Sequence, residues 1–270
     1  MNTEQAKQLS DDCLTRLMEA LERGESDTLK HYLRTMSRFT KYSFGNVCLI
    51  YSQCPSASHV AGYQTWRKLG RQVQKGAKGI VILAPMLGKK KSEDEVTEDD
   101  QTRVFGFRAA HVFDIAVTTG NDLPEFARVR GDPREYMDRL KAFVARKGIT
   151  LEYSDAIAPA KGMCAGTKIT LLPNLEPGEA FAVLVHETAH SALHFGDRRG
   201  ETTKTMRETE AEAVAYVVSE AIGLDTTTSA SDYILTYSGD RATLADSLAF
   251  IQRTAAEILN AILPVDAALS

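Results

Sequence analysis

The chain has 270 residues, of which 43% are hydrophobic and 25% are charged, and its formal net charge is −4. This composition suits one large or two ordinary globular domains and excludes a disordered or fibrous protein. The sequence has no apolar run of about 18 residues, no basic and apolar leader and no CxxC pair, so we expect a cytoplasmic protein without a membrane span, a signal peptide or a cysteine-type zinc site.

The first part of the chain combines helical and strand patterns. Apolar residues recur at helical spacing within residues 14–21 and 29–36, and a short helix is predicted over residues 63–69. A hairpin bounded by glycines is predicted from residues 72–74 and 80–83. These patterns indicate a small mixed domain of helices and strands.

A change of charge divides the chain. Residues up to Gly120 include 17 basic and 14 acidic residues, whereas the remainder includes 15 basic and 22 acidic residues. The resulting charges of +3 and −7 indicate domains with different partners. A charged loop is predicted over residues 89–102 and a linker over residues 118–132. We therefore predict an α+β fold with two domains, residues 1–125 and 126–270.

The second part is mainly helical, with two short strands before the helix that carries the main motif. Helices are predicted over residues 134–146, 177–194, 205–222 and 241–263, and strands over residues 150–153 and 168–172. The strand at residues 168–172 is a candidate edge to which a peptide can add by strand pairing.

An HExxH motif lies in the helix predicted over residues 177–194. Positions i and i+4 share one helix face, so His186 and His190 can bind one zinc ion through neutral imidazoles. Glu187 lies beside the first histidine and can act as general base on a water held at the metal. Zinc is the expected cofactor, and another divalent metal such as Mn²⁺ is the alternative.

A third ligand is predicted in the next helix. Catalytic zinc sites use three protein ligands, and Glu208, Ala211, Glu212 and Ala215 recur on one helical face. We predict Glu208 as the ligand and Glu212 as a carboxylate that orients a ligand histidine, or as the alternative ligand. Glu210 is predicted to point elsewhere.

Two further groups near the motif have less definite roles. His194 continues the stripe of His186 and His190, and we predict that it packs behind the site and does not bind metal. A peptidase also needs a donor for the oxyanion, and Tyr233 is the candidate.

The N-terminal half has the composition of a nucleic-acid-binding surface. Residues 28–92 contain no acidic residue, and their basic residues are interleaved with aromatic ones. Cations attract phosphates, and aromatic rings stack on unpaired bases, so single-stranded DNA is the predicted partner. The predicted DNA-contacting residues are Lys41, Trp66, Arg67, Lys68, Arg71, Lys75 and Lys78. For Trp66 a place in the core is the alternative.

The two halves together resemble one family. The segments SFGN (43–46), GYQTWRKLG (62–70), VQKGAKGI (73–80) and VFDI (112–115) resemble the N-terminal domain of ArdC antirestriction proteins, and LVHETAH (184–190) and RETEAEAVAY (207–216) resemble the peptidase domain of ArdC and LtrC-like proteins. The resemblance implies a domain that binds single-stranded DNA, followed by a gluzincin-like zinc metallopeptidase domain with Glu208 as third ligand.

Three functions follow as hypotheses. The chain binds incoming single-stranded DNA of a mobile element, carries a zinc peptidase that acts on a protein or peptide, and protects that DNA from restriction. Alternatively, it is a regulatory protease of the ImmA or IrrE type that cleaves a repressor. The third hypothesis is a DNA-coating protein whose metal site is idle or structural.

Overall fold

The computed structural model describes residues 1–23, 25–88, 103–121, 134–224 and 241–263. Its contacts form two compact units. The N-terminal unit comprises Met1–Cys13 and Cys48–Asn121, and the C-terminal unit comprises Leu14–Val47 and Asp122–Ser270. Helices α1 (Thr3–Glu22) and α3 (Phe44–Gln53) contribute residues to both units.

The N-terminal unit is built on a long antiparallel pair, β3 (Ile80–Gly88) and β4 (Arg103–Asp114). Strand β1 (Val60–Ala61) pairs with the other edge of β4. The side chains of Ala6, Leu49 and Val81 form a buried apolar cluster. The first three residues of β3, Ile80–Ile82, are all buried, whereas the residues near its end are more exposed, so only the start of this strand lies in the core.

The predicted hairpin between residues 72–74 and 80–83 is wrong. Strand β2 (Arg71–Val73) pairs instead with β5 (Thr118–Gly120), in a separate sheet from β3. Between β2 and β3 the chain makes a tight turn at Gln74–Ala77, in which the Ala77 N–H donates to the Gln74 carbonyl and Gly76 has φ +81°. This turn redirects the chain to another partner strand.

The short helix α4 (Tyr63–Lys68) is joined to β4 by the side chain of Trp66. Trp66 is fully buried, and its Nε1 donates a hydrogen bond of 2.8 Å to the Phe113 carbonyl. Asp114, also buried, accepts backbone N–H bonds from Ser58, His59 and Ala116. Because the carboxylate meets three donors of the loops around β1 and β4, it fixes those loops relative to one another.

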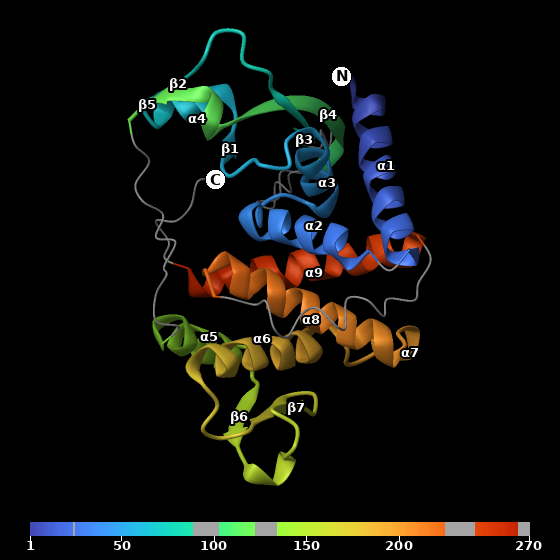
Figure 1. Cartoon of the computed structure of the whole chain (residues 1–270), viewed down its shortest axis with the longest axis vertical. Coiled ribbons are helices and arrows are strands. Elements are labelled where there is room, and N and C mark those ends of the chain that lie inside the picture. Colours follow the sequence, from blue (N-terminus) through green and yellow to red (C-terminus); the bar gives the residue numbers. More distant parts are fainter. Residues whose placement is uncertain (24, 89–102, 122–133, 225–240, 264–270) are drawn as a thin grey trace, which may run out of the picture. The chain divides into compact units, whose positions relative to one another are not determined.

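The C-terminal unit is a layered helical assembly with a small sheet that contacts α5 and α6 (Figure 1). Its described helices are α2 (Ser26–Arg38), α5 (Arg134–Arg146), α6 (Pro177–Leu193), α7 (Arg198–Glu201), α8 (Lys204–Ala221) and α9 (Arg241–Ile262). Helix α8 is central, because it contacts α6, α9 and α2. The helices predicted from residues 134, 177, 205 and 241 are therefore confirmed within a residue or two at each end.

The small sheet has the strand order β6 (Thr150–Tyr153), β8 (Lys168–Leu171), β7 (Gly162–Cys164). Strand β6 is parallel to β8, and β7 is antiparallel to it. Strand β8 is thus central, and the prediction that it offers a free edge is wrong. Strand β7 contacts α6, and among the described strands it pairs along one edge only.

The predicted α+β fold class is confirmed by this mixture of helices and small, mainly antiparallel sheets. The predicted division at residue 125 remains a prediction, because residues 122–133 lie outside the described chain. Residues 14–47 group with the C-terminal unit because α2 packs on α8. The loop predicted over residues 89–102 also lies outside the described residues. None of the described helices has an apolar stretch long enough to cross a bilayer.

Candidate metal centre

Helix α6 holds the HExxH motif firmly in place. It begins with Pro177 in its first turn, where a missing N–H costs nothing. Its inner face buries Phe181, Leu184, Val185 and Leu193. Burial of several large apolar side chains on one helix fixes its rotation, and therefore fixes the direction in which the two motif histidines point.

Helix α8 brings the third candidate ligand to α6. The Thr203 side chain caps its N-terminus by accepting the Met206 N–H at 3.1 Å. Ala211 and Ala215 are buried, on the helical face that also carries Glu208. Small side chains permit the close approach of two helices, so Glu208 can reach the imidazoles on α6.

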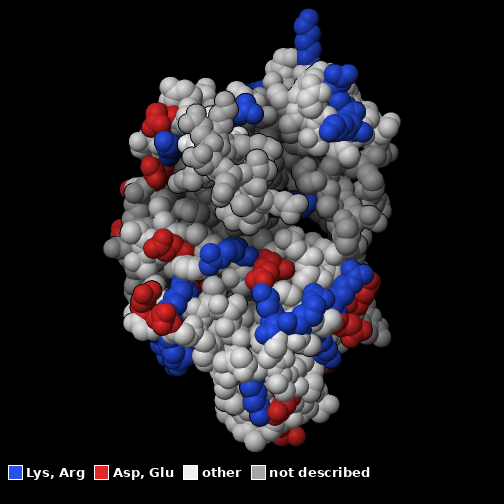
Figure 2. Space-filling model, turned by 180° about the vertical axis from the view of Figure 1, so that it is seen from behind, with Lys and Arg blue, Asp and Glu red and all other residues white. Residues whose placement is uncertain are grey.

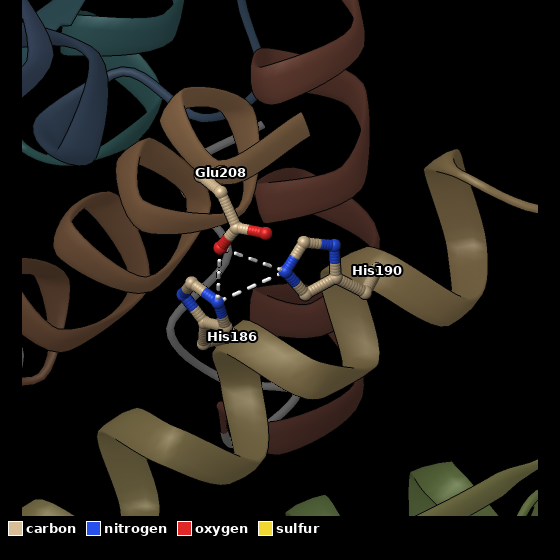
Figure 3. A group of neighbouring side chains, drawn as sticks. All are labelled: His186, His190 and Glu208. Atoms are coloured by element: carbon tan, nitrogen blue, oxygen red, sulfur yellow. Dashed lines mark hydrogen bonds and ion pairs between the residues drawn. The ribbon is translucent and has the colours of Figure 1, made fainter. Parts of the chain in front are cut away.

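His186, His190 and Glu208 converge on one point (Figure 3). The two histidine Nε2 atoms lie 3.0 Å apart, and Glu208 Oε2 lies 3.7 Å from His186 Nε2 and 3.5 Å from His190 Nε2. A tetrahedral ion bonded to three donors at about 2.0–2.2 Å requires separations of roughly 3.3–3.6 Å. The observed separations lie within about 0.3 Å of that range, so small side-chain rotations would let this ligand set hold a divalent metal ion. Among the described residues this is the one such group.

Glu212 lies one turn beyond Glu208 and binds the far side of His186. Its Oε2 is 3.1 Å from His186 Nδ1, which leaves the Nε2 of that ring turned toward Glu208. Burial lowers the pKa of His186, but hydrogen bonds with Glu208 and Glu212 outweigh burial and raise it to about 9. The same imidazoles hold the pKa of Glu208 well below its usual range. A metal ion at this site would therefore compete with a proton on His186.

His190 is oriented by a longer series of hydrogen-bonded side chains, which runs through His194 to Glu210. Its Nδ1 lies 2.9 Å from Nδ1 of His194, whose Nε2 lies 2.9 Å from Glu210 Oε2. Burial lowers the pKa of His194, which favours a neutral ring. A neutral His194 that donates from Nε2 to Glu210 must accept at Nδ1, so His190 donates from Nδ1 and keeps its Nε2 lone pair for a metal.

Glu210 is the buried carboxylate at the end of this series of hydrogen-bonded side chains. It is 0% exposed, and it accepts hydrogen bonds from both terminal nitrogens of Arg198, at 2.8 and 2.6 Å, and from the Ser247 hydroxyl at 2.7 Å. Burial alone would raise its pKa, but bonds from His194, Arg198 and Ser247 hold the pKa of Glu210 at about 2. As predicted, Glu210 does not point at the ligand group, and its part in supporting His194 is an additional finding of the structure.

Sequence reasoning missed Arg198 and Ser247 as members of the site's support. They come from α7 and α9, and no periodicity within α8 could connect them to Glu210. The only available signal was an acidic side chain on the apolar side of α8, since such a group needs a buried partner.

Glu187 lies between the histidines in sequence and faces β7. A Cβ atom built at Gly162 would come within 2.6 Å of Glu187 Oε1 and of Val183 Cγ1. Glycine at this position therefore lets β7 approach the carboxylate closely. Burial raises the pKa of Glu187, although His186 and His190 oppose that shift. A carboxylate with a raised pKa beside a metal-ligand set is suited to accept and return a proton.

The other predicted site residues do not join this group. Tyr233, the predicted oxyanion donor, lies outside the described residues. Trp66 is fully buried, so the prediction that it contacts DNA is wrong, and its alternative place in the core is correct. The Arg71 guanidinium is bonded to β5 and the residue after it. It donates to the Thr118 hydroxyl and carbonyl and to the carbonyls of Gly120 and Asn121.

The remaining predicted DNA-contacting residues are exposed cations in both units. Lys41 belongs to the C-terminal unit, and the others belong to the N-terminal unit. The exposed members of the N-terminal unit are Arg67, Lys68, Lys75 and Lys78.

Comparison with known proteins agrees with the resemblance seen in the sequence. Residues 7–113 match the family model of the N-terminal domain of anti-restriction factor ArdC. Two crystal structures of the antirestriction protein ArdC from plasmid R388, one metal-free and one Mn(II)-bound, share the fold at TM-scores of 0.54 and 0.53, with 18% and 17% identity. Each match covers 93% of this chain, and 96% and 97% of those chains.

A curated relative from Bacillus anthracis, an uncharacterized protein, is 24% identical over 307 aligned positions. The alignment covers 96% of this chain and 51% of the relative, so the chain spans about half of that protein's length. Taken together, the family model and the shared fold confirm the predicted resemblance to ArdC-like proteins.

Metal binding should depend on pH in a definite direction. Because the folded-state pKa of His186 is raised to about 9 from a usual 6.5, its proton stabilises the metal-free fold below pH 6.5, and this contribution is lost as pH rises through 9. Metal must displace that proton, so apparent zinc affinity should rise roughly tenfold per pH unit between these values. Calorimetry in buffers of different ionisation enthalpy measures both affinity and proton release.

Glu212→Gln is the matched variant for this titration. It removes one of the groups that raise the pKa of His186, so the pH range of steep dependence should move to lower pH. A zinc affinity that is flat from pH 6.5 to 9, with no proton released, would contradict the assigned role of His186.

The buried carboxylate on α8 should be far more important for stability than a partly exposed one on the same helix. Glu210→Gln leaves Arg198 without its counter-charge, and we expect the free energy of unfolding to fall by about 3 kcal/mol. Glu220→Gln, which weakens a partly exposed pair with Arg34, should cost less than about 1 kcal/mol. Urea unfolding of the metal-free variants measures both.

A milder variant covers the case in which Glu210→Gln does not fold. Ser247→Ala removes one hydrogen bond to Glu210 and should cost about 1 kcal/mol. An equal decrease in the free energy of unfolding for Glu210→Gln and Glu220→Gln would show that the buried hydrogen bonds of Glu210 stabilise the fold no more than the partly exposed ion pair does.

Proposed function

We propose that this ArdC-like chain binds single-stranded DNA through its N-terminal unit and carries a zinc metallopeptidase centre of the gluzincin type in its C-terminal unit. Its family is one of antirestriction proteins, and the proposed role is the protection of incoming mobile-element DNA. The observation that carries the proposal is the convergence of His186, His190 and Glu208 with Glu187 beside them.

The charge of the part of the N-terminal unit that follows α1 supports the DNA-binding part of the proposal. Within residues 48–88 and 103–121, the sequence contains one acidic residue, Asp114, and that carboxylate is buried among backbone donors. The basic residues in the same ranges are Arg67, Lys68, Arg71, Lys75, Lys78, Arg103 and Arg108. In Figure 2 the region of α4 and β2 carries blue side chains without red neighbours. Such a surface attracts the phosphates of a nucleic acid.

The donor set supports a divalent metal. Two imidazoles and one carboxylate are ligands that zinc accepts, and manganese also accepts such a mixed set. One of the two R388 ArdC structures is Mn(II)-bound, so Mn²⁺ is the alternative ion for this chain. When bound, the ion would act as a Lewis acid and lower the pKa of a coordinated water.

The remaining chemistry belongs to the chain's own side chains. Glu187 would accept a proton from the attacking water and pass it to the nitrogen of the scissile amide. Glu212 and His194 would keep the two ligand rings in one orientation through the reaction. Glu210 would supply the fixed negative charge behind His194.

The free edge of β7 supports a peptide as the substrate. Among the described strands, β8 has neighbours on both sides and β7 has one. Gly162 of β7 lies close to Glu187, because a Cβ built there would come within 2.6 Å of Glu187 Oε1. An extended peptide paired with β7 would lie next to the general base. Strand β7 therefore replaces β8 as the proposed docking strand.

Two other functions remain as alternatives. A regulatory protease of the ImmA or IrrE type would use the same metal centre on a repressor, with the N-terminal unit recognising protein. A DNA-coating protein would need the N-terminal unit alone. Protection of an unmodified plasmid by a Glu187→Gln variant, at the level of the unaltered chain, would favour the coating function.

Substitutions at neighbouring glutamates should separate metal binding from hydrolysis. Glu208→Gln should lower zinc affinity at least tenfold, because it replaces a charged ligand. Glu187→Gln should retain zinc and lose hydrolysis of a casein-derived peptide library by at least a hundredfold. Glu220→Gln, on the same helix as Glu208, is the control and should change neither. Zinc is measured by competition with a chromogenic chelator. Full zinc retention in Glu208→Gln would remove that residue from the ligand set.

Binding to single-stranded DNA should weaken steeply with salt. For the full chain and a fluorescent (dT)20, replacing Lys68 and Lys78 with alanine should reduce the log–log salt slope by about 1.4, because each lost phosphate contact contributes about 0.7. The matched control replaces Lys141 and Arg146, two exposed cations of the C-terminal unit, and should leave the slope unchanged. Equal slopes in all three proteins would argue against an N-terminal DNA surface.

A further inference from the structure

The N-terminal unit contains a hollow that has no part in the metal centre. Its volume is about 630 Å³, within the range of sites that hold a small molecule or one residue of a polymer. It lies beside α4, β2 and the turn after β2. The side chains that give it its chemical character are those of Tyr63, Gln72, Gln74, Lys75, Phe113 and Thr119.

Tyr63 presents an aromatic ring to this hollow. The residue is the first of α4 and is 40% exposed, whereas Trp66 on the same helix is fully buried. Its hydroxyl accepts a hydrogen bond of 2.7 Å from Gln72 Nε2 on β2. The ring is therefore fixed by the helix backbone at one end and by the hydrogen bond to Gln72 at the other. Little conformational entropy would be lost when a flat ligand stacks on it.

The rim of the hollow is a fixed turn with a cation. The Gln74 N–H donates to the Val117 carbonyl at 3.0 Å, and the Ala77 N–H donates to the Gln74 carbonyl at 3.1 Å. Gly76 has φ +81°, and a Cβ built there would meet no atom within 4 Å. The space beside Gly76 is therefore open. The neighbouring Lys75 is exposed, so its ammonium group can reach a ligand in the hollow.

Polar side chains complete the hollow from the sheet side. Gln72 of β2 pairs directly with Thr119 of β5, so their side chains lie on the same face of this two-stranded sheet. Amide and hydroxyl groups can donate to or accept from the edge of a base. Phe113, half-buried, adds a second aromatic ring to the lining.

We infer that this hollow holds one unpaired nucleobase of a bound single strand, stacked on Tyr63, with the adjacent phosphate at Lys75. The inference rests on the proposed binding of single-stranded DNA and assigns a particular base-binding place to it. The described lining of the hollow offers a flat aromatic ring, polar groups that can meet a base edge, and a cation, and it includes no acidic residue. These groups match the base and the phosphate of a nucleotide. An apolar peptide would leave the cation and the amide groups without partners, and an acidic side chain has no flat face to stack on Tyr63.

The test compares aromatic substitutions in the full chain. Tyr63→Ala should weaken binding to fluorescent (dT)20 by about five- to a hundredfold, the usual effect of losing one stacked base. Tyr63→Phe keeps the ring and should remain within about threefold of the unaltered chain. Phe107→Ala, an exposed aromatic of β4 outside the hollow, is the matched control and should also have little effect. Thermal melting checks that each variant is folded.

A strand without bases provides the second readout. On a 20-nucleotide strand of abasic sites, the unaltered chain and Tyr63→Ala should bind equally, because no base remains to stack. Lys75→Ala should weaken binding to both strands and reduce the salt slope by about 0.7. These effects separate loss of stacking from loss of charge.

The outcomes distinguish the two levels of the proposal. If the unaltered chain does not bind (dT)20 at low salt, the proposed DNA-binding function fails. If it binds, but Tyr63→Ala binds equally well or Phe107→Ala loses as much, the base-binding hollow is refuted and DNA binding stands.

Discussion

The contact between α6 and α8 is the constraint on which the candidate site depends. One helix supplies two imidazoles a turn apart, and the other supplies a carboxylate that must meet them within a few tenths of an ångström. Buried alanines on α8 permit this approach, and the apolar face of α6 prevents that helix from rotating. A larger side chain at Ala211 would separate the helices and move Glu208 out of reach.

Behind this contact lies a fully buried negative charge. An isolated carboxylate in the protein interior is costly, and Glu210 is tolerated because Arg198, Ser247 and His194 all donate to it. The arrangement links α7, α8 and α9 to His190 through side chains alone. The stability of the C-terminal unit and the orientation of a metal ligand thus depend on the same group, and this dependence explains why an acidic residue is kept inside an otherwise apolar layer.

Much of the metal centre could be predicted from the sequence, because helical periodicity determines which residues share a face. His186 with His190, and Glu208 with Glu212, follow from that rule, and the structure brings them together. The role of Glu210 could not be predicted, since its partners come from α7 and α9. The strand pairing could not be predicted from the sequence either, because local patterns do not specify the partners of β2 and β8. Trp66 shows that an aromatic in a basic stretch can belong to the core.

Anomalous X-ray diffraction at the zinc edge, on crystals of the full chain grown with zinc, tests the central geometric claim most directly. We expect one strong peak about 2.0–2.2 Å from Nε2 of His186, Nε2 of His190 and a carboxylate oxygen of Glu208, with one coordination position open to solvent. A peak bound through Nδ1 of either histidine, or one with Glu208 outside the coordination sphere, would contradict it.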